Sequence, residues 1–309
     1  DTLSGGSGDD ILVGGSGTDT AVFSGDMEDY RITPNVDGSE ITVTDTQGTD
    51  GTDTLSGVEN LEFADSTVKI SDDNDGEARV NSYTSGIQND VSVTGLANGN
   101  YVVTWNDDSG NNNPAGGSSY DIRAQVYNEQ GNTIGDELLV NSWTGSAQYD
   151  PSVAALNDGG FVVTWRDDSG HDGGSGYDIR GQRYDKVGTS IGDEFLVNTN
   201  VTSHQYDPSV VAHGDGFVVT WWDQDGNDDS QGGSGYDIFA KTFSTTDAGG
   251  NAVTTPVVDA DEFLVNTYTS GSQYQPSVGS LSDGGFIVTW RDDKGSNHDG
   301  GNGVDVFGQ

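Results

Sequence analysis

One apolar segment recurs four times along the chain and consists of an aromatic residue, two β-branched residues, Thr and Trp. Aromatic and β-branched residues bounded by Gly, Asp and Asn favour β-strands. No 3.6-residue period of useful length occurs anywhere, so the sequence predicts an all-β protein. The four copies run from Tyr101 to Trp105, Phe161 to Trp165, Phe217 to Trp221 and Phe286 to Trp290.

Each copy is the second of four strand candidates in a repeat that begins near Glu77. In the second repeat these candidates begin at Pro151, Gly160, Tyr177 and Glu194. Residues that accept positive φ separate the first two candidates, which is typical of a tight hairpin. These turn pairs are Asn98-Gly99, Asp158-Gly159, Asp215-Gly216 and Asp283-Gly284.

Side-chain alternation predicts which residues share a face of the sheet. It places Phe161, Val163 and Trp165 on one face, because successive side chains of a strand point to opposite faces. Tyr177 and Ile179 of the next strand are expected to pack beside them.

Consecutive four-stranded units favour the blades of a β-propeller, although the period exceeds the usual roughly 40–50 residues. A row of separate small sandwiches is the alternative. The fourth repeat reaches only its third strand, at Val304 to Gln309, whereas an unused copy of the fourth strand stands at Glu77 to Asn81. Pairing of these two segments would close a four-bladed ring. If further blades follow Gln309, the segment at Glu77 would instead close a larger ring or none.

The N-terminal stretch from Gly5 to Val22 has a different pattern, a nine-residue unit of Gly-Gly-x-Gly-x-Asp followed by an apolar position. Glycine lets the backbone coil tightly, and carboxylates beside such turns suit Ca²⁺, which takes six to eight oxygen ligands. A nonapeptide of this type is typical of a calcium-binding parallel β-helix; a flexible Gly/Ser/Asp linker is the alternative. The predicted metal residues here are Asp1, Gly5, Gly6, Gly8, Asp10, Gly14, Gly15, Gly17 and Asp19.

Over Asp1 to Phe23 this motif resembles the repeats-in-toxin family of exported bacterial proteins. The resemblance implies a calcium β-roll end with capping strands over residues 1–70, and it implies secretion to the extracellular space or the cell surface. It also implies an ion between Asp1 and the turn at Gly14 to Asp19. Residues 71–76 form an acidic linker, and residues 77–309 hold the four repeats.

The net charge limits the classes of partner that the chain is expected to bind. Fifty-one acidic residues against eleven basic ones give a net charge of −40. Nucleic acid and anionic membranes need clustered Lys and Arg, so neither is expected as a partner. The chain has no cysteine, which excludes disulfides and thiolate metal sites, and no apolar run is long enough to span a bilayer.

An acidic, Gly-rich loop follows each repeated Trp and is a second candidate for Ca²⁺ binding. Oxygen ligands alternating with Gly are what a hard cation needs. The alternative is a solvated loop whose Asp side chains cap their own turns. The candidate ligands are Asp107, Asp167, Asp223, Asp225 and Asp292.

Sequence signals for catalysis are weak. The four histidines form no His-Glu-x-x-His motif, and the chain has neither Cys nor Gly-x-Ser-x-Gly. His171 and His298 lie in similar acidic loops and could bind a transition metal. The simpler interpretation is that they are exposed loop residues without a ligand. The sequence therefore predicts no catalytic residue and no enzyme activity. The Gln-Tyr pairs at Gln148, Gln205 and Gln273 could present aromatic faces to sugar rings, or pack between repeats.

Together these features predict a calcium-dependent extracellular structural or adhesion protein. The resemblance to repeats-in-toxin proteins implies that it is a piece of a larger protein exported by type I secretion. Its expected partners are calcium, surface glycans, peptides or neighbouring copies. Two alternatives stay open, a glycan- or peptide-binding module and the accessory region of a secreted hydrolase.

Overall fold

The computed structural model describes residues 1–34, 40–69, 79–109, 120–170, 176–201, 203–224, 235–269, 271–293 and 304–309. They form two compact units, one of residues 1–80 and 127–133 and the other of residues 81–126 and 134–309. Apart from one short 3-10 helix, η1 (Met27–Asp29), the regular structure is entirely β. The all-β prediction is confirmed. Within the described ranges, no helix has the length and hydropathy needed to cross a membrane.

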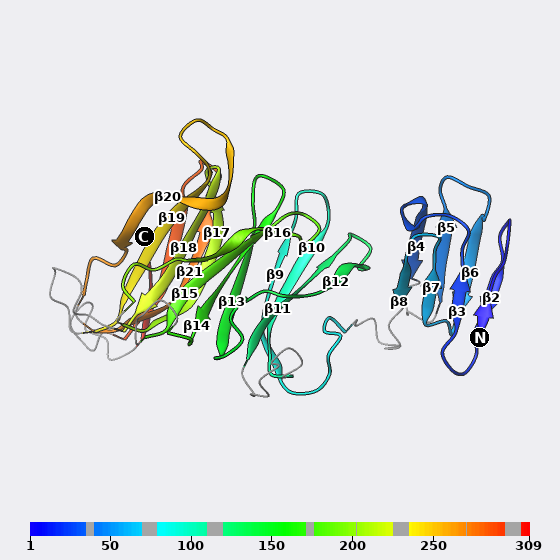
Figure 1. The fold of residues 1–309 in the computed structure, drawn as a ribbon, viewed down its shortest axis with the longest axis horizontal. Helices are drawn as coiled ribbons and strands as arrows, with labels where there is room; N and C mark the ends of the chain where they lie inside the picture. The colour runs from blue at the N-terminus through cyan, green and yellow to red at the C-terminus, as the bar shows by residue number, and fades with distance from the viewer. Residues whose placement is uncertain are drawn as a thin grey trace. The chain divides into compact units, whose positions relative to one another are not determined.

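The second unit consists of four antiparallel sheets in sequence order, which we call blades 1 to 4 (Figure 1). Blade 1 contains β9 (Gln88–Gly95), β10 (Tyr101–Asp107), β11 (Asp121–Tyr127) and β12 (Thr133–Leu139). Blade 2 contains β13 (Gln148–Ala155), β14 (Phe161–Asp167), β15 (Asp178–Tyr184) and β16 (Ser190–Leu196). Blade 3 contains β17 (Gln205–His213), β18 (Gly216–Asp223), β19 (Asp237–Thr246) and β20 (Ala252–Leu264). Blade 4 has three described strands, β21 (Gln273–Ser280), β22 (Phe286–Asp292) and β23 (Asp305–Gly308).

The hairpins between first and second strands follow the predicted turn chemistry. Gly99, Gly159 and Gly284 adopt φ of 89°, 89° and 90°. In blade 3 the turn is shifted, because Gly214 rather than Gly216 takes positive φ, at 59°.

The second strand of each inner blade is buried on both faces, which explains why it reads as an almost continuous apolar run. Phe161, Val163 and Trp165 pack in a cluster with residues of blade 1. Val162, between them in sequence, packs in a separate cluster with Phe217 and Trp221 of blade 3.

One detail of the alternation prediction is wrong. Ile179 lies in the same cluster as Val162, not beside Trp165, because Trp165 is paired with Arg180 across the strands and Ile179 with Arg166. The aromatic neighbour of Phe161 is Tyr184, with stacked rings 5.0 Å apart.

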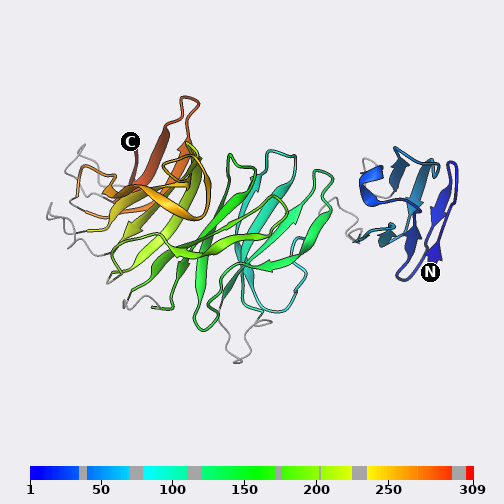
Figure 2. The ribbon, with the colours of Figure 1, turned by 45° about the horizontal axis from the view of Figure 1, so that its top comes forward.

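The blades pack face to face through their first strands, with β9 against β13, β13 against β17 and β17 against β21. Figure 2 shows the same order from a second direction. No strand pairing joins β23 to residues 79–81 in the part of the chain that the structure describes, where β23 is paired with β22 alone. The predicted closure of a four-bladed ring within one chain is therefore not found; Glu77 and Ala78 lie outside the described residues.

The first unit contains two four-stranded sheets. One has the order β1 (Thr2–Leu3), β3 (Thr20–Val22), β7 (Asn60–Glu62) and β8 (Thr67–Lys69), with β1, β3 and β7 parallel. The other has the order β2 (Ile11–Val13), β6 (Thr52–Ser56), β5 (Ile41–Asp45) and β4 (Tyr30–Pro34), with β2 and β6 parallel. A core that includes Phe23, Leu55 and Leu61 lies inside this unit.

Candidate functional site

A backbone bulge recurs at the start of the first strand in every blade. The residue two positions after the first Gln of that strand adopts the left-handed region: Asp90 at φ 52°, Asp150 at 57°, Asp207 at 49° and Gln275 at 55°. The pairing register shifts at the same point in each hairpin. A non-Gly residue at positive φ is uncommon and costs roughly 1–3 kcal/mol, and such strain gathers at functional sites.

These four residues line one cavity of about 390 Å³, where the first strands of all four blades meet. The cavity is lined by three Asp and one Gln together with Ser92, Ser152 and Ser209, and by three prolines that follow the bulges. It therefore combines ionisable groups and hydroxyls with small apolar surfaces. Sequence reasoning missed this site, although the Asp-Pro-Ser triplet in the second and third repeats was a signal for it.

Each aspartate is held by the residue that follows the repeated Trp on the second strand. Asn106 donates its side-chain amide to Asp90 at 2.7 Å, and Trp222 donates its indole N–H to Asp207 at 2.8 Å. In blade 2 the Arg166 guanidinium lies 3.2 Å from the Asp150 carboxylate. The position after each Trp therefore determines the polarity around the cavity.

Asp150 is the carboxyl group most affected by this environment. Burial raises the pKa of Asp150 to about 6, opposed by the nearby Arg166 and reinforced by the negative charges of Asp207 and Asp90. A carboxyl group with this pKa is protonated in a large fraction of molecules near pH 6, so it can donate a proton.

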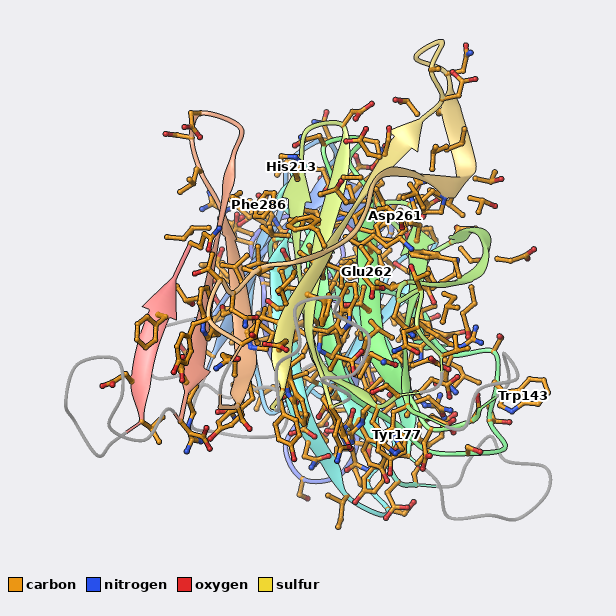
Figure 3. The ribbon with its side chains drawn as sticks, turned by 90° about the vertical axis from the view of Figure 1, so that its left-hand side faces the viewer. Trp143, Tyr177, His213, Asp261, Glu262 and Phe286 are labelled. Atoms are coloured by element: carbon orange, nitrogen blue, oxygen red, sulfur yellow. The ribbon has the colours of Figure 1, made fainter. Side chains whose placement is uncertain are left out.

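An aromatic belt adjoins the cavity, because in blades 2 to 4 a Tyr directly precedes the bulge residue. Tyr206 stacks on Trp222 with centroids 4.1 Å apart, and Tyr177 meets Tyr206 edge to face at 5.3 Å. Figure 3 shows Tyr177 at one end of the sheets and His213 and Phe286 at the opposite end.

Arg166 joins the belt to the cavity. Its guanidinium lies 4.6 Å from the Tyr149 ring centroid, 5.2 Å from that of Tyr206 and 5.3 Å from that of Tyr177. The belt residues are half-buried, so their rings are partly accessible. The Gln-Tyr pairs that the sequence singled out thus pack between blades and also border a polar cavity.

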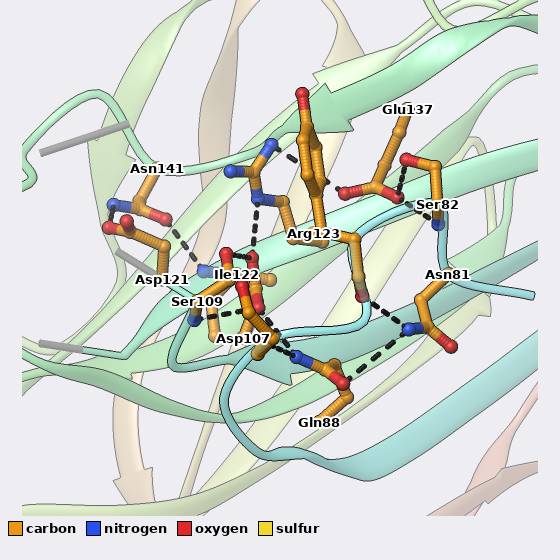
Figure 4. Close-up of polar contacts among 12 residues, drawn as sticks. Asn81, Ser82, Gln88, Asp107, Ser109, Asp121, Ile122, Arg123, Glu137 and Asn141 are labelled. Carbon is orange, nitrogen blue, oxygen red and sulfur yellow. Dashed lines mark hydrogen bonds and ion pairs between the residues drawn. The ribbon is translucent and has the colours of Figure 1, made fainter. Parts of the chain in front are cut away.

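The predicted loop ligands form contacts within the protein. Asp107, Asp167, Asp223 and Asp292 are each at most 3% exposed. Asp107 accepts hydrogen bonds from Gln88 at 3.0 Å and from the Ser109 backbone N–H at 2.9 Å, and it lies 3.3 Å from Arg123 (Figure 4). Asp225 lies outside the described residues, as do His171 and His298.

The N-terminal glycines adopt the backbone that the motif predicts. Gly6, Gly8, Gly15 and Gly17 have φ of 85°, 103°, 94° and 121°. Gly5 and Gly14 are close-packed, since a Cβ on Gly14 would lie 1.9 Å from the Gly57 carbonyl oxygen.

One expected neighbour is present in this unit. Asp1 lies beside the turn at Gly14 to Asp19, because its N-terminal ammonium donates to the Thr18 carbonyl at 3.0 Å and to the Asp19 carboxylate at 2.5 Å. The Asp19 side chain is 1% exposed. Asp10 lies beside the later strand β6, where its N–H donates to Asp53 at 2.8 Å. Among the described residues, no three His, Cys, Asp or Glu side chains gather as a metal site. Binding of Ca²⁺ stays a prediction.

No protein-family model matches this sequence, and no curated protein matches it either. Solved structures of low similarity include an endo-arabinase from Bacteroides thetaiotaomicron, with 12% identity over 90% of this chain and 92% of that one, at a TM-score of 0.40. A second is the GH93 α-L-arabinofuranosidase of Fusarium graminearum with arabinobiose, with 11% identity over 71% and 61% and a TM-score of 0.46. A third is the GH43 endo-arabinanase from Bacillus licheniformis, with 13% identity over 91% and 92% and a TM-score of 0.40.

These comparisons correct three expectations. The similar structures are β-propeller glycoside hydrolases and not repeats-in-toxin proteins, so the family assignment and the description as a calcium-binding adhesin are withdrawn. The prediction that the chain is not an enzyme is withdrawn as well, because those proteins are enzymes. The architecture of successive four-stranded sheets rests on the strand pairing of this chain itself.

Proposed function

We propose that the blade unit binds oligosaccharides at the cavity where the four first strands meet, as part of an extracellular protein that acts on glycans. The observation that carries this proposal is the junction of a polar cavity with an aromatic belt through Arg166. Sugar rings offer apolar faces to aromatic side chains and hydroxyls to carboxylates, amides and serines. Small-ligand sites combine apolar surface with a few placed polar groups in this way.

The bulges supply the polar half of the site. Positive φ at Asp90, Asp150 and Asp207 brings three carboxylates to one cavity. Each is already fixed by a partner on its own hairpin, so a ligand would meet ordered acceptors. Ordered groups lose little conformational entropy on binding, which favours affinity.

A second activity, glycoside hydrolysis, is favoured by the pKa of Asp150. Glycosidases pair a protonated carboxyl group, which donates to the leaving oxygen, with an ionised carboxylate that activates water or attacks the sugar. In this proposal Asp150 donates the proton. Asp207, held by the Trp222 indole, is the second carboxyl group of the pair.

Binding is tested by isothermal titration calorimetry of the 309-residue chain with arabinobiose and with a panel of longer neutral oligosaccharides. Tyr206→Ala removes a ring of the belt and should weaken binding by tenfold or more. Phe263→Ala is the matched control, because Phe263 is an aromatic residue on β20 that is 38% exposed and belongs to neither the cavity lining nor the aromatic belt. Equal loss in both variants, or no binding by the unaltered chain, would refute the site.

Hydrolysis has a separate test. Asp150→Asn removes the acid but tolerates positive φ, since Asn is favoured there. Reducing-end release should fall at least a hundredfold while oligosaccharide affinity changes little. Turnover unaffected by this change would place the chemistry elsewhere.

A further inference from the structure

The cavity where the four first strands meet is rich in carboxyl groups. Three of its four bulge residues are aspartates, and the fourth, Gln275, is uncharged. The carboxyl groups are near enough to affect one another: besides burial, the charges of Asp207 and Asp90 contribute to the raised pKa of Asp150. None of the described residues that line the cavity is a Lys, an Arg or a His. The lining therefore contains acidic groups and no basic one.

Only one of these carboxyl groups has a cation beside it. The Arg166 guanidinium, from the neighbouring strand, lies 3.2 Å from the Asp150 carboxylate. Asp90 and Asp207 have neutral donors instead, a side-chain amide at 2.7 Å and an indole N–H at 2.8 Å. Neither of these two forms an ion pair in the part of the chain that the structure describes. The carboxyl groups of blades 1 and 3 are thus hydrogen-bonded but lack a cationic partner.

Asn106 adds a buried acceptor on the blade 1 side. Its amide N–H donates to the Asp90 carboxylate, and this contact fixes which way the amide points, because a carboxylate accepts hydrogen bonds. The other end of the amide, Asn106 Oδ1, has no hydrogen-bond donor among the described residues, although the side chain is 0% exposed. A buried acceptor without a donor is costly. The blade 1 side therefore has an excess of acceptors.

The aromatic belt beside the cavity already accommodates cations. The Arg166 guanidinium lies 5.2 Å from the Tyr206 ring centroid, and in blade 4 that of Arg291 lies 4.9 Å from the Tyr274 ring centroid. The faces of such rings attract cations electrostatically. Blade 3 has Trp222 at the position of these arginines, stacked on Tyr206 with centroids 4.1 Å apart. Its side of the belt offers aromatic surface next to a carboxyl group and brings no cation of its own.

We propose that the cavity selects oligosaccharides that carry protonated amino groups over their neutral counterparts. This inference rests on the proposed function, because it names the class of sugar that the same site prefers. An ammonium group has three N–H donors and no acceptor, so it complements carboxyl groups and a buried amide oxygen. Acidic sugars are disfavoured at the same place, because like charges repel.

The two halves of the site have different tasks in this proposal. The ammonium group bonds Asp90 or Asp207, the two carboxyl groups without a cation. The sugar ring lies against the Tyr rings of the belt, which bind neutral and cationic sugars alike. The carboxyl groups therefore supply the preference for an amino sugar, and the belt supplies affinity for the ring.

Isothermal titration calorimetry of the 309-residue chain at pH 6 tests the preference. The probes are β-1,4-linked tetramers of glucosamine, N-acetylglucosamine and glucose, which differ only at carbon 2 of each ring. Free amines of this kind are protonated at that pH. The glucosamine tetramer should bind at least tenfold more tightly than the other two. Equal affinities would overturn the selectivity and leave the proposed function standing, whereas no binding of any oligosaccharide, arabinobiose included, would overturn both.

Two opposite changes at bulge residues show whether the cavity is responsible. Asp90→Asn removes a carboxyl group, and Asn tolerates positive φ, so the preference for the glucosamine over the glucose tetramer should fall at least tenfold. Gln275→Asp adds a carboxyl group at the same place in blade 4 and should raise that preference severalfold. Asp136→Asn is the control, because it removes one charge from an exposed residue of β12 outside the cavity lining. Equal effects of Asp90→Asn and Asp136→Asn would assign the attraction to the net charge of −40 and overturn the proposal.

A cationic ligand without a sugar ring provides the last comparison. Tetralysine carries ammonium groups but has no ring to place against the Tyr residues of the belt. It should bind at least tenfold more weakly than the glucosamine tetramer. Equal or tighter binding of tetralysine would indicate a site for a basic peptide and would overturn the assignment to amino sugars.

Discussion

Nη1 of Arg166 lies 3.2 Å from Oδ2 of Asp150 across the first hairpin of blade 2. This ion pair places the guanidinium between a carboxylate in the cavity and the rings of the aromatic belt. Both side chains are partly exposed, at 18% and 27%, so Arg166 offsets only part of the desolvation of Asp150. The pKa of Asp150 therefore remains raised in spite of a close cation.

The raised pKa of Asp150 predicts a pH-dependent stability. Because the folded-state pKa of about 6 exceeds the ordinary 3.8, the folded protein binds this proton more tightly than the unfolded chain. The contribution is fully present below about pH 4 and is lost as pH rises through about 6. Between pH 4 and pH 7.5 this group should lower the free energy of unfolding of the unaltered chain by roughly 1–3 kcal/mol. Asp150→Asn should abolish that decrease, as measured by urea unfolding at the two pH values.

The control for this experiment is Asp136→Asn, a change at an exposed carboxylate on β12. It should leave the difference between the two pH values as it is in the unaltered chain. A difference that is the same in all three proteins would contradict the assignment to Asp150.

The hydrogen bond from the Trp222 indole to Asp207 can be tested separately from the stacking of the Trp222 ring. Trp222→Phe keeps an aromatic ring over Tyr206 but removes the donor to Asp207. Loss of a hydrogen bond to a charged group costs about 1.5–3 kcal/mol, so oligosaccharide affinity should fall by roughly tenfold or more. Tyr236→Phe is the control, because it keeps a ring beside Trp222 and leaves the donor to Asp207 in place. Calorimetry compares the oligosaccharide affinity of the two variants, and equal effects would argue against the Asp207 contact.

The strands and turns of the blades were predictable from the sequence because neighbouring residues specify them. The strand from Phe161 to Trp165 and the turn at Gly159 are specified by residue type and spacing, and both were identified correctly. The left-handed bulge at Asp150 was not foreseen, since Asp favours turns as readily as bulges. That the bulge residue lines a cavity becomes evident only from the fold, in which the first strands of the four blades meet.

The contacts between blades could not be predicted for a different reason. Whether Asn81 reaches β23 depends on the packing angle between sheets, which is the sum of many contacts such as that of Val153 against blade 1. The loop aspartates illustrate the same limit. Asp167 looks like a solvated ligand in sequence, yet it is 2% exposed and bonded to Arg180.

The buried charges of blade 2 predict a large loss of stability for one substitution. Arg180 Nε donates to Asp167 at 2.8 Å, and its Nη1 donates to Glu194 at 3.0 Å. Arg180→Met leaves two buried carboxylates without their cation, which typically costs 3–5 kcal/mol. Urea unfolding should show this loss, and the double change Arg180→Met with Glu194→Gln should recover part of it. No recovery would mean that packing, not charge, dominates.

Gly176 lies at the junction of blades 2 and 3, at a position with no room for a side chain. It lies just before β15, and a Cβ there would be 1.5 Å from the carbonyl oxygen of Ser203, in the segment before β17. Because the obstacle is backbone, no side-chain rotation can relieve it, so the two blades must separate locally. Overpacking of this kind costs at least 1–3 kcal/mol, and Gly176→Ala should lower the melting temperature by several degrees. Gly145→Ala is the control, because its Cβ would meet only the Trp143 ring nitrogen, at 3.6 Å; a similar loss in both variants would reject the steric explanation.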